Sequence, residues 1–123
     1  MYLSRKIFDA AIQRKPDGSP GLIADLSLQQ LLSLKGMDRF IDPKEIEKLL
    51  LSTNYMQTID QNFHLLVNLT DLDISINHIT VIQNLESLDN LRLLNLSNNR
   101  ITKIENLEAL RNLEVLVCFF FCK

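Results

Sequence analysis

The stretch from Leu69 to Leu116 decides the fold, because it contains one 22-residue unit twice and the start of a third. The units read LTDLDISINHITVIQNLESLDN (69–90), LRLLNLSNNRITKIENLEALRN (91–112) and LEVL (113–116). Alignment of the first two matches Leu72 with Leu94, Ile74 with Leu96, Asn77 with Asn99, Ile79 with Ile101, Ile82 with Ile104, Asn84 with Asn106, Leu85 with Leu107, Leu88 with Leu110 and Asn90 with Asn112. A fixed period in the twenties is typical of a solenoid, in which each unit stacks on its neighbours.

Each unit has three parts, which differ in their spacing. Leu72 and Ile74 alternate around Asp73, so we expect strands with one buried face near residues 49–51, 72–74, 94–96 and 116–118. An asparagine follows where the chain turns, and a buried amide there can bond backbone groups that the turn leaves unpaired. The predicted asparagine ladder consists of Asn54, Asn77 and Asn99. Apolar residues then recur at every third position, which favours a 3₁₀ or irregular return segment.

These features define a leucine-rich repeat. They predict an α/β solenoid with short parallel strands on its concave face, a 3₁₀ or irregular convex side, and an N-terminal helical segment. The pattern LxxLxLxxNxIxxIxxLxxLxx resembles the repeats of the protein phosphatase 1 nuclear regulatory subunit and of axonemal dynein light chains, over residues 46–116. Residues 101–116, ITKIENLEALRNLEVL, are most similar to the phosphatase subunit. The resemblance implies phosphatase regulation or, alternatively, a structural role in cilia, axonemes or centrosomes.

The chain from residue 46 onward divides into repeats 46–68, 69–90 and 91–112 and a partial repeat 113–123. Repeat 46–68 has 23 residues, because Phe63 and Leu66 lie one position later than the spacing after Ile59 requires. We expect this additional residue on the convex side, where repeats tolerate insertions.

Residues 22–45 are interpreted as an imperfect N-terminal capping coil, since terminal repeats must close one side of the stack. The expected strand pair is Leu26 and Leu28, although no ladder asparagine follows. The every-third series of this coil is Leu31, Leu34, Met37 and Phe40. An equally supported alternative is an α-helix that Asp25 caps and that runs to about Leu34.

Residues 1–21 are predicted to be an N-terminal amphipathic helix, up to about Lys15, followed by a Pro- and Gly-containing linker. The helix would pack on the solenoid through its apolar residues Leu3, Ile7, Phe8 and Ala11. A basic targeting or membrane-docking segment is the less favoured interpretation.

The partial repeat departs from the pattern, because the position 22 residues after Asn99 holds Phe121 instead of asparagine. We favour a truncated product of a longer protein over an exposed docking patch as the explanation of the three phenylalanines at 119–121. We expect marginal stability and self-association through residues 101–122. The apolar residues that would lack a neighbour are Ile101, Ile104 and Leu107.

Composition restricts the function class further. The chain has 123 residues and a formal charge of −2, which argues against nucleic acid and membrane surfaces as partners. No signal peptide or apolar run of membrane-spanning length is present in the sequence, so we expect a cytoplasmic protein, with cilium or cytoskeleton and nucleus as the alternative locations. Cys118 falls on a core position, and a zinc site would need more ligands than this end of the sequence supplies.

No combination of residues predicts catalysis, a cofactor or a metal site, so we expect a non-enzymatic protein. Asp71 and Asp73 share one strand face, and a hydrolase that uses both carboxylates is the remote alternative. Function is instead expected on the concave face, where a protein partner contacts outward side chains of the strands. The predicted partner-binding residues are Leu50, Ser52, Asp71, Asp73, Ser75, Leu93, Asn95, Ser97 and Asn98.

Overall fold

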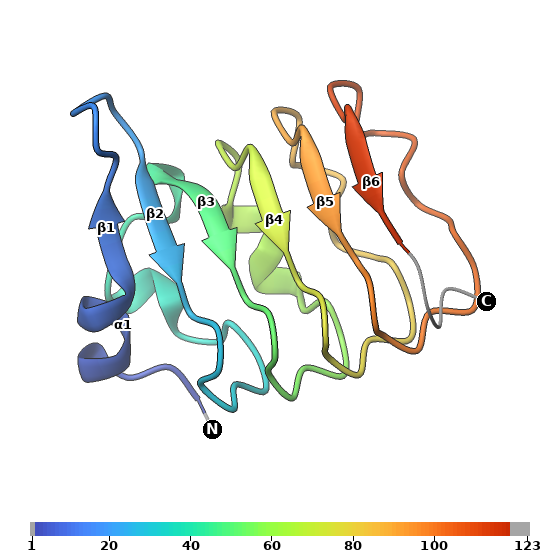
Figure 1. Cartoon of the computed structure of the whole chain (residues 1–123), viewed down its shortest axis with the longest axis horizontal. Helices are drawn as coiled ribbons and strands as arrows, with labels where there is room; N and C mark the ends of the chain where they lie inside the picture. Colours follow the sequence, from blue (N-terminus) through green and yellow to red (C-terminus); the bar gives the residue numbers. More distant parts are fainter. Residues whose placement is uncertain (1, 119–123) are drawn as a thin grey trace.

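The computed structural model describes residues 2–118, which form a mixed six-stranded sheet with one α-helix and short 3₁₀ helices. The elements are α1 (Arg5–Ala11), β1 (Ile12–Arg14), β2 (Leu22–Asp25), η1 (Met37–Arg39), η2 (Pro43–Glu45), β3 (Ile46–Leu50), η3 (Gln61–Leu65), β4 (Asp71–Asp73), β5 (Leu93–Asn95) and β6 (Val115–Val117). The strands lie side by side in chain order, with β1 and α1 at one end of the sheet and β6 at the other (Figure 1). β1 is antiparallel to β2, and the later pairs are parallel.

The parallel strands align equivalent positions of successive repeats. Leu72 pairs with Leu49 on one side and with Leu94 on the other, as the repeat spacing predicts. β4, β5 and β6 begin and end one residue earlier than expected, and β3 begins three residues and ends one residue earlier. The predicted alternation is confirmed: Leu72 and Ile74 are fully buried and Asp73 between them is partly exposed. Fully buried return-segment residues complete the layer of repeat 69–90: Ile79, Ile82, Leu85 and Leu88.

The predicted asparagine ladder is also confirmed. Asn77 is 5% exposed, and its Oδ1 accepts a hydrogen bond from the Met56 amide at 3.1 Å. Its Nδ2 donates to the carbonyls of Leu51, Ile74 and Ser75 at 3.0–3.1 Å. Asn54 and Asn99 are buried and make equivalent bonds. Each ladder asparagine therefore bonds the turn of the repeat that precedes it.

Two further rows of asparagines join the repeats, and the sequence alignment matched them without assigning them a role. In the return segments, Asn84 Nδ2 donates to the Ile59 carbonyl and Asn106 Nδ2 to the Ile82 carbonyl, both at 2.7 Å. The row just before the strands consists of Asn68, Asn90 and Asn112, which donate to the carbonyls of Lys44, Val67 and Asp89. In repeats 46–68 and 69–90, backbone groups at three points therefore form hydrogen bonds with asparagines of the following repeat.

The N-terminal helix is shorter than predicted, since α1 ends at Ala11 instead of near Lys15. Ile12–Arg14 form β1 because antiparallel pairing with β2 supplies backbone hydrogen bonds to the edge of the sheet. Residues 15–21 are consequently the turn of a hairpin and not a linker. In that turn, hydrogen bonds from the Ser19 hydroxyl and amide hold the pKa of Asp17 below its ordinary value.

The capping coil has its strand earlier than expected. Ala24 pairs with Leu49, so the strand pair is Ala24 and Leu26, both fully buried, while Leu28 is 74% exposed. The alternative of a helix from Asp25 to Leu34 is wrong, because Asp25 Oδ1 accepts from the Ser27 amide in a turn and no helix follows it before η1. The expected every-third series is confirmed in Leu31, Leu34 and Met37, which are fully buried, and in Phe40, which is partly buried against the core.

The additional residue of repeat 46–68 lies in η3, within the return segment, as expected for an insertion on the side away from the strands. Asp60 Oδ1 accepts from the Asn62 amide at 2.9 Å and so caps this 3₁₀ helix. Phe63 and Leu66 are both fully buried despite their shifted spacing. The tight 3₁₀ turn thus absorbs the extra residue without exposing the apolar series.

The last part of the described chain is less buried than the repeats before it. Leu116 is 39% exposed, whereas Leu94 at the equivalent position is fully buried. Ile104 is 49% exposed and Leu107 is partly buried, as predicted, but Ile101 is fully buried, contrary to expectation. Cys118, which the pattern places on a buried core position, is half-buried against the core and disulfide-bonded. Residues 119–123, including Phe121 at the ladder position, lie outside the described residues.

A left-handed residue precedes the ladder position in the four layers that the structure describes at this point, and it gives a testable prediction. The residues are Leu28, Thr53, Ile76 and Asn98, with φ between 54° and 60°. Ile76 is β-branched and 47% exposed, so it is strained there without contributing to the core. We expect Ile76→Asn to raise the free energy of unfolding by about 1 kcal/mol. Urea denaturation measures this, and Val81→Asn, at an exposed site outside the left-handed region, should give no gain.

Candidate protein-interaction surface

The strands present two rows of outward side chains, which together we call the strand face. Backbone register places Ile23, Lys48, Asp71, Leu93 and Val115 next to one another in the first row. The second row consists of Asp25, Leu50, Asp73, Asn95 and Val117. All ten side chains are partly or fully exposed, because residues on this side alternate with the buried core positions. Neighbours within a row are separated by the strand spacing of about 4.8 Å.

Charge is unevenly distributed along the strand face. Lys48 and Asp71 are adjacent in the first row, and no ion pair within residues 2–118 engages either of them. The β5 and β6 positions carry no charge, since they are Leu93, Asn95, Val115 and Val117. The face is therefore polar and charged over β2 to β4 and mainly apolar over β5 and β6.

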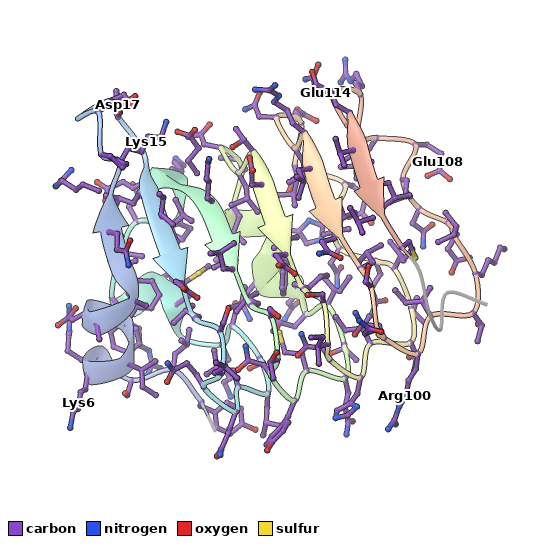
Figure 2. The ribbon with its side chains drawn as sticks, viewed as in Figure 1. Lys6, Lys15, Asp17, Arg100, Glu108 and Glu114 are labelled. Carbon is purple, nitrogen blue, oxygen red and sulfur yellow. The ribbon has the colours of Figure 1, made fainter. Side chains whose placement is uncertain are left out.

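An open hollow of about 330 Å³ lies over the first row. Its lining residues are Glu47, Lys48, Thr70, Asp71, Arg92, Leu93, Glu114 and Val115. Two ion pairs hold three of its rim residues: Lys15 pairs with Glu47, and Arg92 Nη2 lies 3.0 Å from Glu114 Oε2. Figure 2 shows Glu114, Lys15 and Asp17 near the N-terminal ends of the parallel strands, and Arg100 beyond their C-terminal ends. The hollow thus contains the oppositely charged Lys48 and Asp71, the apolar Leu93 and Val115, and a rim of charged side chains held in ion pairs.

Several predicted partner-binding residues have local structural contacts. Ser75 and Ser97 are 7% and 3% exposed, so the structure does not place them on the accessible part of the strand face. Asp73 Oδ1 accepts from the Ser75 hydroxyl at 2.6 Å and amide at 2.9 Å, and Asn95 Oδ1 accepts from the Ser97 amide at 3.0 Å. In both cases the side-chain oxygen accepts from the backbone amide two residues later, which forms an Asx turn at the end of the strand. Asn98 occupies the left-handed position, and Ser52 is partly buried beside Ser75.

Leu50, Asp71 and Leu93 are the predicted residues that remain accessible on the strand face without such a turn contact. Ile23 and Asp25 also belong to this face, but the sequence interpretation missed them because it placed the first strand too late. The signal was present in the sequence: Asp25-Leu26-Ser27 matches Asp73-Ile74-Ser75 and Asn95-Leu96-Ser97. In all three, the first side chain accepts from the serine amide.

The geometry gives no support to hydrolysis by Asp71 and Asp73. Asp71 Oδ1 accepts from the Thr70 hydroxyl at 2.9 Å, and Asp73 is engaged by Ser75. Among residues 2–118, no group of three His, Cys, Asp or Glu side chains could hold a metal ion. In the same range, no helix is long and apolar enough to cross a membrane.

One cluster on the return side contains the residue types of a serine-hydrolase triad. His64 Nε2 lies 3.5 Å from Glu86 Oε2, and His64 Nδ1 lies 3.5 Å from Ser87 Oγ. The Ser87 hydroxyl, however, donates to the His64 carbonyl at 2.9 Å, and Asn84 Oδ1 lies 3.2 Å from Nε2. These contacts join repeat 46–68 to repeat 69–90, so we assign the cluster to repeat stacking.

Comparison with known families matches residues 67–108 and 89–122 to the family described as leucine-rich repeats, in two copies. These segments contain the repeats whose strands are β4, β5 and β6, which supports a leucine-rich-repeat family for this part of the chain. Such repeats generally mediate protein–protein interaction, and domains built from them are typically non-enzymatic. No curated protein matches the chain.

Proposed function

We propose that this chain is a non-enzymatic protein-interaction module, a solenoid whose concave strand face binds one protein partner. The observation that carries the proposal is the hollow over the first row, where Lys48, Asp71, Leu93 and Val115 lie side by side on parallel strands. Asparagine rows fix the backbone on both sides of these strands. A rigid surface loses little conformational entropy when it binds, which favours recognition by preformed contacts.

The chemistry of the strand face defines the kind of partner. Lys48 and Asp71 favour a segment that carries an acidic and a basic side chain at matching separation. Leu93 and Val115 favour an apolar anchor beside them, and such anchors usually provide most of the binding energy of an interface. We therefore expect the partner to insert an apolar side chain over β5 and β6 and to align its charges over β3 and β4.

Within this class, we propose regulation of a protein phosphatase as the particular role, with the protein in the cytoplasm or nucleus. The support is the similarity of residues 101–116 to the repeats of the phosphatase 1 nuclear regulatory subunit. The second candidate is a ciliary, axonemal or centrosomal structural component, supported by the same 22-residue pattern in axonemal dynein light chains.

The test is Leu93→Glu, measured by isothermal titration against the purified catalytic subunit of protein phosphatase 1. We expect the wild-type chain to bind and the variant to bind at least ten-fold more weakly, which corresponds to about 1.4 kcal/mol. Asp71→Lys should lower the affinity several-fold, with the loss decreasing as salt is added. Asp73 is unsuitable for this test because its substitution would also release the Ser75 turn.

Val81→Glu is the matched control, since Val81 is exposed in a return segment and not on the strand face. Equal weakening by Val81→Glu and Leu93→Glu would contradict the strand face as the binding surface. If the wild-type chain does not bind the phosphatase but co-sediments with purified axonemes, and Leu93→Glu alone abolishes this, the second candidate replaces the first.

A further inference from the structure

The turns that follow the parallel strands form an edge of the repeat stack, which we call the turn edge. Backbone hydrogen bonds between adjacent layers keep equivalent positions of these turns side by side. The turn edge has two rows of partly or fully exposed residues: Leu28, Thr53, Ile76 and Asn98 just before the ladder position, and Gln30, Tyr55, His78 and Arg100 just after it. It shares no residue with the strand face and lies beyond the C-terminal ends of the strands, where Figure 2 shows Arg100.

Three apolar side chains of the turn edge are exposed although the turn does not require them. Leu28 is 74% exposed, Tyr55 50% and Ile76 47%. Leu28 and Ile76 have φ angles of 60° and 54°, in the left-handed region that bulky and β-branched residues adopt only with strain. Asn98 has φ 58° at the equivalent position, so a residue suited to this conformation fits the same turn. The chain therefore loses stability at Leu28 and Ile76 in order to expose apolar side chains, and such strain and exposure are typical of a binding surface.

The charge of the turn edge restricts its partner. None of its residues is acidic, although acidic residues outnumber basic ones in the chain. Arg100 is exposed, and no ion pair within residues 2–118 engages it. The rings of Tyr55 and His78 are stacked with their centroids 6.4 Å apart, so an aromatic surface connects the apolar residues to Arg100. The turn edge is thus apolar over the first three layers and cationic at the fourth.

We propose that the turn edge binds an amphipathic helix of a partner protein, through apolar residues on one helix face and an acidic residue further along that face. Leu28, Tyr55 and Ile76 come from three consecutive layers, so they follow one another at the strand spacing of about 4.8 Å. On a helix, residues i+3 and i+7 lie about 4.5 and 10.5 Å along the axis from residue i, close to one and two layers. An extended segment presents alternate side chains about 6.8 Å apart and does not match this spacing.

Arg100 defines the position of the acidic residue. It lies in the fourth layer, about 14 Å from the layer of Leu28. Residue i+10 of a helix lies about 15 Å along the axis from residue i and on the same face as i+3 and i+7. The helix that fits therefore has apolar residues at i, i+3 and i+7 and an aspartate or glutamate at i+10, whose carboxylate would pair with Arg100.

A second copy of the chain offers no such helix among residues 2–118. Their α-helix is α1, whose seven residues span about 10 Å, less than the four layers. Phe8 and Ala11 of α1 are also already buried in the core. Contact between two turn edges would join surfaces without acidic residues, so Arg100 would gain no counter-charge. We therefore assign the occupant to a different protein.

The proposal is tested with a fluorescein-labelled synthetic helix of about 18 residues, long enough to be helical in water. The peptide consists of alanine and glutamine, with leucine at i, i+3 and i+7 and glutamate at i+10, and is titrated into the full chain by fluorescence anisotropy. We expect saturable binding in the micromolar range. A control peptide of the same composition, with the three leucines on different faces of the helix, should bind at least ten-fold more weakly.

Ile76→Asn is the informative variant, because it should weaken peptide binding at least ten-fold while it stabilises the chain. Lost binding then cannot result from unfolding, and urea denaturation of the same sample verifies this. Val81→Asn, at an exposed return-segment site, should change neither property. Arg100→Glu should lower the affinity several-fold, with the loss decreasing as salt is added.

Equal binding of the two peptides, or the absence of saturable binding, would overturn the proposal. Wild-type affinity in Ile76→Asn would also overturn it, as would a loss of stability in that variant, because the strain argument would then be wrong. A dimer of the full chain that dissociates in Ile76→Asn, seen by sedimentation velocity, would make a second copy the occupant instead. Ile76→Asn should leave phosphatase binding by the strand face intact, so failure of either proposal can be recognised separately.

Discussion

Replacement of Leu94 by alanine is expected to lower the free energy of unfolding by about 2–5 kcal/mol, which is the usual range for a buried leucine. Leu94 is fully buried in β5, between the equivalent Leu72 of β4 and Leu116 of β6. Removal of its side chain would leave a cavity. The flanking layers cannot move in to close it, because backbone pairing between β4, β5 and β6 keeps the strands at a fixed spacing. For a domain with a total stability of about 5–15 kcal/mol, this loss would be a large fraction of the whole.

Leu116→Ala is the matched control for Leu94→Ala. It removes the same atoms from the same position of the repeat, but Leu116 is 39% exposed. We expect less than half the loss caused by Leu94→Ala, because a smaller apolar area returns to water and no closed cavity forms. Urea denaturation of both variants measures the difference, and equal losses would show that the β6 layer is as well packed as the β5 layer.

Asn77→Ala is the second substitution for which we expect a large effect, a loss of about 2–4 kcal/mol. It would leave the Met56 amide without its acceptor in a site that is only 5% exposed. The Leu51 and Ile74 carbonyls would each lose one of two donors and keep the bonds from the other ladder asparagines. An unsatisfied buried group costs about 1–3 kcal/mol. Because these groups belong to two layers, the loss should appear as lower stability of the whole repeat stack.

The control for Asn77→Ala is Asn90→Ala, which removes an exposed amide whose hydrogen bond to the Val67 carbonyl is 3.4 Å long. Water can replace that contact, so we expect a change of less than about 1 kcal/mol. Guanidinium or urea midpoints with unchanged slopes would verify that both variants differ from the wild type in stability alone. A loss for Asn77→Ala no greater than that for Asn90→Ala would contradict the ladder as a main source of stability.

The ladder and the asparagine row just before the strands differ in burial and in the number of hydrogen bonds, which explains these magnitudes. Asn54, Asn77 and Asn99 are at most 5% exposed, and each accepts from at least one backbone amide while it donates to carbonyls of two layers. Asn68, Asn90 and Asn112 are exposed, and each has one donated contact to a backbone carbonyl. Water cannot reach the backbone groups that the ladder asparagines bond, so losing a ladder amide leaves such a group unsatisfied. Water can reach the carbonyls that Asn68, Asn90 and Asn112 bond, so it can take the place of those amides.

The sequence by itself determined the repeat. The 22-residue offset fixed which leucines pair, the alternation around Asp73 fixed which side is buried, and the three-residue step to Asn77 fixed the ladder. These features repeat along the chain and depend on contacts between adjacent layers, so local spacing is sufficient to specify them. The accessible residues Leu50, Asp71 and Leu93 of the candidate interaction surface follow from the same register.

Only the tertiary structure decided what lies outside the regular repeats. Ile12–Arg14 form a strand because β2 offers an open edge, and this pairing overrides the apolar helical spacing of the N-terminal segment. Ser75 and Ser97 are buried because the carboxylate of Asp73 and the amide of Asn95 bend the chain toward the core after each strand. Ile101 is buried and Ile104 is exposed, although both belong to the every-third apolar positions of repeat 91–112. Their exposure depends on which side chains of the neighbouring repeats pack against each of them. Such contacts join residues far apart in the sequence, and spacing within one repeat contains no information about them.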